Sequence, residues 1–293
     1  MTDWQERITA GTDPSVRAEH TLRYAVAGPV VAQAGTWCDL GCGLGLAAEW
    51  ATDGPFGGRL VLVDVDEASV VQAAAHLRAG DVTALSADLD EPAGRAAVRA
   101  AVLDGPGPRA ITCFEVLEHV RDLPGVVELL VELATEHATT VVLSVPNDAF
   151  WAIENPFHET TWSAGAFGEL RAMLPAEHVY AEQLPLRGSR ITVGGDGGDG
   201  GYEPGAIEPA GGAAASHFIA AFGPAAGELR GGAQVFEADQ HGERAWTRQR
   251  EANLAHLEAQ VADWRTYIHD LEDRLGLPRA GSEAAMALER RGE

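Results

Sequence analysis

The amino-acid sequence predicts an α/β fold, a Rossmann-like, doubly wound, mostly parallel sheet of about seven strands, followed by a C-terminal helix with a heptad pattern. Three observations support this prediction. Short apolar segments rich in β-branched residues alternate with helical segments of roughly ten to fifteen residues, a spacing typical of βαβ units. A glycine-rich turn directly follows the first predicted strand, and the last part of the chain carries apolar residues at heptad spacing.

The length and charge of the chain limit its size class and its partners. Its 293 residues are 46% hydrophobic, so the chain can form one sizeable core with appendages. Lysine and arginine number 21 against 44 aspartates and glutamates, a net charge of −23. This charge repels phosphate backbones and anionic membranes, because a site for either would have to gather its few cations against the overall field. Nucleic acid and membrane partners are therefore disfavoured.

The N-terminus and the cysteines bear on the cellular location. The first residues, MTDWQERITAGTD, contain acids and no apolar signal core, and no apolar run approaches the roughly 18 to 20 residues of a membrane-spanning helix. We therefore expect a soluble, cytoplasmic protein. Cys38, Cys42 and Cys113 give neither an even disulfide set nor a paired zinc motif, so small buried thiols are the favoured interpretation.

The first helix is predicted over Arg17 to Ala34. Its apolar residues Leu22, Val26 and Val30 recur at the spacing of one helical face. The elements expected next are a strand at Thr36 to Leu40, a glycine turn at 41–45, a helix through Trp50 and a strand at Arg59 to Asp66.

Helices and strands alternate through the rest of the predicted sheet. The run TTVVLSVPN has the continuous β-branched character of a buried strand. The helices are expected over 67–80, 93–103 and 123–137, and the strands over 82–88, 109–116, 139–147, 177–185 and 215–223. Ligands of such sheets bind at the carboxyl ends of the strands.

A segment rich in glycine and proline separates the last two predicted strands. Its sequence, GGDGGDGGYEPGAIEPAGGAAA, has too few large apolar residues to bury much surface. We predict a mobile surface loop over 194–214, beside the substrate cleft. The alternative is a linker between domains, but the strand that follows it suits the same sheet.

The C-terminal segment over 240–293 is rich in helix formers. A helix with a narrow apolar stripe must bury it, either against a second subunit or on its own catalytic domain, and the narrow stripe favours a homodimer. We therefore divide the chain into an N-terminal helical cap at 1–34, a main domain at 35–239 and this helix with its tail. The heptad positions are Leu254, Leu257, Val261, Trp264, Ile268, Leu271 and Leu275.

The glycine turn, CDLGCGLG, indicates a nucleotide-like cofactor. Glycines let the backbone turn sharply and approach a ligand that a Cβ atom would exclude. A dinucleotide fingerprint would need a glycine where this chain has Leu46. Asp39, two residues before Gly41, suits a cationic or amine-bearing ligand better than a pyrophosphate.

The motif DLGCGLG resembles the first motif of class I S-adenosylmethionine-dependent methyltransferases, and the similarity runs from about His20 to Gly223. The resemblance implies that the turn holds the methionine part of S-adenosylmethionine. It also implies that Asp64 accepts hydrogen bonds from both ribose hydroxyls, with Asp66 as a rival whose alternative role is to cap the next helix. Asp88 matches the acid that meets the adenine amino group, or else is an ordinary turn residue. The cofactor residues implied are Asp39, Gly41, Cys42, Gly43, Gly45, Asp64, Val65, Asp88, Leu89 and Phe114, with Arg23 and Tyr24 as lesser candidates.

A second motif, CFEVLEHV, follows the fourth predicted strand. On one helical turn, Glu115, Glu118 and His119 would share a face, beside the transferable methyl group. Carboxylates this close raise one another's pKa unless a cation is shared, so the motif invites a metal.

The motif resembles a subgroup that contains the O-methyltransferases of ubiquinone biosynthesis and the methyltransferases of the 3′-terminal 2′-hydroxyl of small RNAs. In the latter, two glutamates, a histidine and a distant histidine bind a divalent ion. The resemblance implies Glu115, Glu118, His119 and His158 as ligands of Mg²⁺, Mn²⁺, Fe²⁺ or Zn²⁺. It implies His119, His158 and Glu115 as catalytic residues. Two alternatives are a histidine that acts as a base without metal, and purely structural roles.

The acceptor predicted from these motifs is an oxygen. The Asn/Asp-Pro-Pro-Tyr/Phe motif of many nitrogen methyltransferases is replaced by FEVLEH. The expected partner is a small-molecule hydroxyl of a sugar, glycoside or secondary metabolite. Two alternatives are an RNA 3′-terminal 2′-O-methyltransferase, which the negative charge disfavours, and a non-catalytic cofactor-binding scaffold that dimerises through its C-terminal helix.

Overall fold

The computed structural model describes residues 8–9, 11–151, 155–185, 214–232, 260–262 and 264–276. The chain forms two compact units, Met1–Phe236 and Glu237–Glu293. Apart from Ala214, the predicted glycine-rich loop at 194–214 lies outside the described residues.

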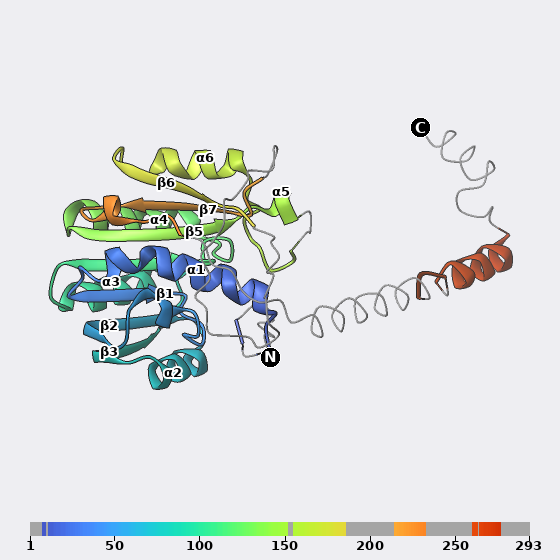
Figure 1. The fold of residues 1–293 in the computed structure, drawn as a ribbon. Coiled ribbons are helices and arrows are strands. Elements are labelled where there is room, and N and C mark those ends of the chain that lie inside the picture. The colour runs from blue at the N-terminus through green and yellow to red at the C-terminus, as the bar shows by residue number, and fades with distance from the viewer. Residues whose placement is uncertain are drawn as a thin grey trace, which may run out of the picture. The chain divides into compact units, whose positions relative to one another are not determined.

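The first unit contains one seven-stranded sheet in the order β3-β2-β1-β4-β5-β7-β6 (Figure 1). All pairs are parallel except those of β7, which runs antiparallel to β5 and β6. The predicted doubly wound, mostly parallel sheet is therefore confirmed. The strands are β1 Thr36–Leu40, β2 Phe56–Asp64, β3 Ala79–Ser86, β4 Arg109–Phe114, β5 Thr139–Pro146, β6 His178–Gln183 and β7 His217–Phe222.

Helices cover both faces of the sheet, because successive strand residues point to opposite faces. In β4, Ile111 and Cys113 join the core cluster that contains residues of α3, α4 and α6, whereas Ala110 and Phe114 join the cluster that contains residues of α1 and α2. The helices are α1 Pro14–Val31, α2 Glu67–His76, α3 Pro92–Asp104, α4 Leu123–Glu136, α5 Asp148–Trp151 and α6 Ala164–Met173, with 3₁₀ turns η1 Ala48–Ala51 and η2 Ala226–Glu228.

Two predicted helices are shorter than the sequence pattern indicated. The helix through Trp50 is only the single turn η1, because Thr52 is extended and the turn residues Asp53, Gly54 and Pro55 follow at once. The helix predicted over 67–80 ends at His76, because β3 already pairs with β2 from Ala79 onwards.

The second unit contains a helix over 260–262 and 264–275, as predicted (Figure 1). The heptad residues Val261, Trp264, Ile268 and Leu275 expose 44–69% of their surface. Leu254 and Leu257 lie outside the described residues, so a heptad seam stays a prediction. No helix in the described part of the chain is long and apolar enough to span a membrane.

Candidate functional site

The residues predicted from the sequence to form the site lie at one edge of the sheet, here called the carboxyl edge. It is the edge at which the parallel strands β1, β2, β4 and β5 end. Because β7 is antiparallel, it begins at this edge, where His217 pairs with Pro146 on one side and Gln183 on the other. Open α/β sheets bind their ligands here.

The glycine turn after β1 is tight in two places and open in one. Gly41, Gly43 and Gly45 all have positive φ angles, of 76°, 52° and 73°. A Cβ atom on Gly41 would collide with the Val116 side chain, whereas a Cβ on Gly43 would meet nothing within 4 Å. The turn thus leaves the backbone of Gly43 accessible to a ligand.

Asp64 connects the end of β2 to this turn. Its carboxylate accepts hydrogen bonds from the backbone N–H of Gly43 (2.9 Å) and of Asp66 (3.0 Å). Its role toward a ribose stays a prediction. The Asp66 carboxylate instead accepts from the backbone N–H (3.2 Å) and hydroxyl (2.7 Å) of Ser69, and so caps α2. This contact is the alternative that the sequence left open for Asp66.

Asp39 is fully buried, with both oxygens bound inside the protein. Tyr24 donates to them at 2.9 and 3.1 Å, and the Thr112 hydroxyl donates at 2.6 Å. Burial raises the pKa of Asp39 to about 6, although the hydrogen bonds from Thr112 and Tyr24 limit the rise. Direct contact between Asp39 and a cofactor would require Tyr24 or Thr112 to move.

The other residues predicted to bind the cofactor differ in exposure. Val65 and Asp88 are exposed, and the Asp88 side chain accepts from the backbone N–H of Asp90 (2.9 Å), as in an ordinary turn. Arg23 is 1% exposed and donates to the Gln183 side chain at 2.9 Å. The remaining predicted residues are buried: Cys42, Leu89 and Phe114. The free cysteines Cys38, Cys42 and Cys113 are all buried, as predicted.

The EVLEH segment is not helical, which corrects the prediction of one shared helical face. Glu115 has a φ of 54°, in the left-handed region, and the residues up to α4 form turns and bends. The backbone N–H of Glu115 still donates to Ser144 O (3.3 Å), because this residue continues the pairing of β4 with β5. Glu115 therefore has a different set of contacts from Glu118 and His119.

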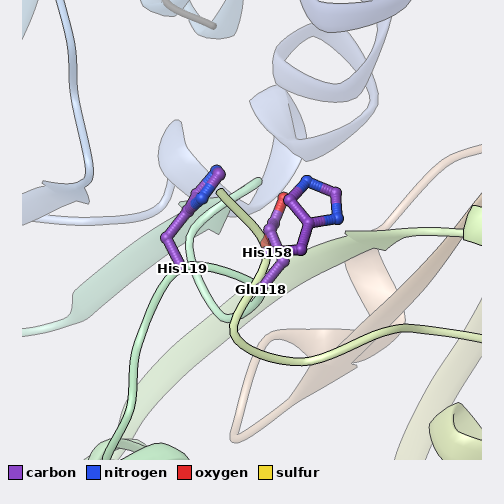
Figure 2. Close-up of side chains that lie close together, drawn as sticks. All are labelled: Glu118, His119 and His158. Atoms are coloured by element: carbon purple, nitrogen blue, oxygen red, sulfur yellow. The ribbon is translucent and has the colours of Figure 1, made fainter. Parts of the chain in front are cut away.

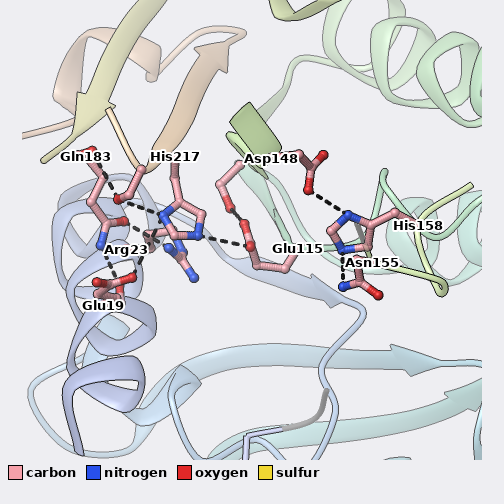
Figure 3. Close-up of polar contacts among 10 residues, drawn as sticks. Glu19, Arg23, Glu115, Asp148, Asn155, His158, Gln183 and His217 are labelled. Carbon is pink, nitrogen blue, oxygen red and sulfur yellow. Dashed lines mark hydrogen bonds and ion pairs between the residues drawn. The ribbon is translucent and has the colours of Figure 1, made fainter. Parts of the chain in front are cut away.

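Glu115 contacts His217, a residue that the sequence analysis did not select (Figure 3). Its Oε2 lies 3.2 Å from His217 Nε2, and its Oε1 accepts from the Ser144 hydroxyl at 2.8 Å. Burial alone would raise the pKa of Glu115, but the positive charges of His217 and Arg23 hold it well below its ordinary value. The strand pattern around His217 gave no sign that β7 is antiparallel, so it could not place this residue at the carboxyl edge.

Three of the four predicted metal ligands come together (Figure 2). Potential ligand atoms of Glu118, His119 and His158 all lie within 4.8 Å of one another, and Glu115 is not part of this group. Among the described residues, the same criterion selects one other group, Glu132 with Glu136 and His137 at the end of α4. We call Glu118, His119 and His158 the EHH cluster.

Hydrogen bonds between two loops hold the EHH cluster. The carbonyl oxygen of Glu118 accepts from the backbone N–H of Glu159 (2.8 Å) and Thr160 (3.2 Å). His119 Nδ1 lies 3.1 Å from the carbonyl oxygen of Phe157. His158 Nδ1 lies 2.9 Å from Asp148 Oδ1 (Figure 3), a contact that the sequence analysis missed, although an acid directly after the strand ending in SVPN was a usable signal.

The comparisons with known proteins place these features in a family. A family model described as "Methyltransferase domain" matches residues 16–183. Among solved structures, the small RNA methyltransferase HEN1 matches with 18% identity and a TM-score of 0.48, over 80% of this chain and 28% of the HEN1 chain. The methyltransferase domain of bacterial-CtHen1-CN matches with 17% identity and a TM-score of 0.45, over 72% of this chain and 100% of the other.

A third solved structure is the N-methyltransferase NodS from Bradyrhizobium japonicum WM9 in complex with S-adenosyl-L-homocysteine. It matches with 14% identity and a TM-score of 0.44, over 73% of this chain and 89% of the other. No curated protein matches the chain. Because the family model covers more than half of the 293 residues, this chain belongs to the methyltransferase domain family and is a class I S-adenosylmethionine-dependent methyltransferase.

Proposed function

We propose that this methyltransferase transfers the methyl group to the oxygen of a small-molecule hydroxyl, such as that of a sugar, glycoside or secondary metabolite, with the help of a divalent metal. The observation that carries the proposal is the EHH cluster, whose three candidate ligand atoms lie within 4.8 Å of one another. Glu118 and His119 follow β4 at the carboxyl edge, which is also the edge of the glycine turn, because β1 and β4 are parallel neighbours.

The residues of the EHH cluster fit a transition metal. One carboxylate and two imidazoles suit Fe²⁺, Mn²⁺ or Zn²⁺ better than Mg²⁺, which prefers oxygen ligands. His119 Nδ1 faces a carbonyl oxygen and His158 Nδ1 faces a carboxylate, so in each ring Nδ1 is the donor and Nε2 is the nitrogen without a proton. The Asn155 amide lies 2.9 Å from His158 Nε2, and a metal bound to this nitrogen would take its place. A metal held by Glu118, His119 and His158 would lower the pKa of an acceptor hydroxyl.

The protein residues contribute to catalysis by positioning the groups that react. Methyl transfer from a sulfonium has a good leaving group, so proximity and alignment of the nucleophile provide much of the rate. The Glu118 carbonyl binds the loop at 159–160, which brings His158 next to the segment that follows β4. Glu115 binds His217 instead. We therefore propose that Glu115 lines the site of the methyl acceptor and is not a metal ligand.

Metal-free catalysis is the runner-up. In that case His119 or His158 acts as the base through the same Nε2 lone pair, and the acceptor would be a phenol or another hydroxyl of low pKa.

An RNA 3′-terminal hydroxyl is a further candidate acceptor. The net charge of −23 argues against it, because binding to phosphates depends on basic side chains. Retention of the protein on a 3′-hydroxyl RNA at moderate salt would favour RNA as the acceptor, and no retention would remove it.

The metal proposal is tested by elemental analysis of the purified protein and by calorimetric titration of Zn²⁺ and Mn²⁺ into the chelator-treated protein. Glu118→Gln should lose the metal, whereas the matched variant Glu115→Gln should keep it. Both variants should still bind S-adenosylhomocysteine. Equal loss in both variants would restore Glu115 as a ligand, and absence of metal from the wild type would contradict metal assistance.

A further inference from the structure

We infer that Asp148 is a positioning residue for His158: it holds the imidazole proton on Nδ1 and so keeps Nε2 unprotonated, as a metal ligand or a base requires. The use of Nε2 as a metal ligand rests on the proposed function. The orientation of the proton does not, because two independent chains of hydrogen bonds determine it.

The first chain starts at Trp162. The backbone N–H of Trp162 donates to Asp148 Oδ2 at 2.5 Å, and the backbone N–H of Asp148 donates back to the Trp162 carbonyl at 3.0 Å. These bonds fix the carboxylate at the start of α5. Its other oxygen, Oδ1, lies 2.9 Å from His158 Nδ1. A carboxylate only accepts hydrogen bonds, so Nδ1 must be the donor.

The second chain starts at Phe157 and reaches the opposite side of the ring. The backbone N–H of Phe157 donates to Asn155 Oδ1 at 3.0 Å, which identifies the amide oxygen. The amide nitrogen, Nδ2, therefore lies 2.9 Å from His158 Nε2. An amide nitrogen only donates, so Nε2 must accept and carries no proton. Both chains give the same neutral tautomer.

This tautomer is the one that the cluster needs. A histidine needs an unprotonated ring nitrogen both to bind a metal ion and to accept a proton as a general base. The side chains of His158 and Asp148 are 11% and 10% exposed, so solvent has little access with which to replace the carboxylate. Carboxylate–histidine pairs of this kind orient histidine ligands in metal sites.

The decisive variant is Asp148→Asn. The Trp162 N–H still needs an acceptor, so the asparagine oxygen should face Trp162 and its NH₂ group should face His158 Nδ1. That arrangement makes Nδ1 the acceptor and moves the proton to Nε2. In ¹⁵N-labelled, metal-free protein, long-range ¹H–¹⁵N spectra should show His158 as the Nδ1–H tautomer in the wild type and as the Nε2–H tautomer in Asp148→Asn. Calorimetry should show a loss of affinity for Zn²⁺ and Mn²⁺ of about 10- to 100-fold.

Two further variants separate positioning from general damage to the loop. Asp122→Asn makes the same chemical change at an aspartate that also accepts from a backbone N–H, that of Gly125 at 3.2 Å, without contact with His158. It should alter neither readout. Asn155→Ala removes the amide that occupies Nε2, so the affinity for metal should stay the same or rise.

Three results would overturn the inference: an Nε2–H tautomer in the wild type, an unchanged tautomer in folded Asp148→Asn, or an equal loss of metal affinity in Asn155→Ala. The wild type could also bind no metal, yet show the Nδ1–H tautomer and the change of tautomer in Asp148→Asn. That result would contradict the metal proposal and leave Asp148 as the positioning residue of a histidine base. Retained binding of S-adenosylhomocysteine reports that each variant is folded.

Discussion

Asp64 and Asp66 are two residues apart, yet their carboxylates have different contacts. Asp64 binds the backbone of the glycine turn, whereas Asp66 binds Ser69 at the start of α2. If Asp64 binds the ribose as predicted, Asp64→Ala should weaken binding of S-adenosylhomocysteine by about tenfold or more, because a charged hydrogen-bond acceptor is lost. Calorimetric titration measures this.

Asp66→Ala is the matched control for Asp64. It should leave the cofactor affinity unchanged and lower the free energy of unfolding by about 1 kcal/mol, because α2 loses its cap. If the two variants exchanged these effects, the ribose role would belong to Asp66.

Asp39 makes the stability of the protein depend on pH. Its pKa of about 6 lies above the ordinary value for an aspartate, so the folded state holds the proton more tightly than the unfolded chain does. The protonated form favours folding below pH 4, and this contribution is lost as the pH rises through about 6. The loss is on the order of 3 kcal/mol.

Asp39→Asn should remove this dependence, since the amide does not ionise. Urea unfolding at pH 5 and pH 7 should show a smaller drop in the free energy of unfolding for Asp39→Asn than for the wild type. Equal drops would show that the Asp39 carboxyl titrates alike in the folded and unfolded states.

At the scale of elements, the glycine turn combines a steric constraint with an opening. Gly41→Ala should destabilise the fold, because the new Cβ would collide with Val116 at a φ of 76°. Gly43→Ala should cost only about 1–2 kcal/mol of left-handed strain, because its Cβ would point into open space.

The two glycine variants differ in what they report. In thermal unfolding, the melting temperature of Gly41→Ala should be well below that of Gly43→Ala. Gly43→Ala should nevertheless weaken binding of S-adenosylhomocysteine, since the methyl group occupies the approach to the turn. Unchanged cofactor affinity in Gly43→Ala would mean that the ligand does not approach the backbone there.

Most elements could be predicted from the sequence because their signals are local. Thr36–Leu40 was placed with its full bounds, since a short apolar run is bounded by glycines on both sides. The EVLEH segment was misjudged, because the i, i+3, i+4 spacing indicates a shared face only on a helix. Here Glu115 has a left-handed φ of 54°, and α4 begins only at Leu123.

The candidate site was predictable only in part, for a related reason. Glu118, His119 and His158 come together as the resemblance implied. His217 and Asp148 were missed because their positions depend on the direction of β7 and on the path of the loop after β5. The direction of β7 arises from pairing between segments far apart in the chain, and no local pattern encodes it. Asp148 did carry a local signal, since it directly follows a predicted strand, but its contact with His158 depends on the path of the loop.

At the scale of the whole molecule, the C-terminal helix is the candidate for self-association. Four of its described heptad residues, Val261, Trp264, Ile268 and Leu275, are exposed and apolar. A chain that ends before Gln240 should be monomeric and the full chain dimeric, because the stripe would be buried between two copies. Light scattering measures both masses, and equal masses per chain would contradict dimerisation through this helix.

The pairing of β6 with β7 has a consequence for engineering. Gln183 and His217 are direct cross-strand partners, so β6 ends and β7 begins at the same point of the carboxyl edge, next to Glu115. The register between β6 and β7 therefore does not depend on how many residues connect them. Each doubling of the length of this connection costs only about 0.6 kcal/mol of closure entropy. A change in the length of this connection should therefore leave every described strand, and the EHH cluster, in place.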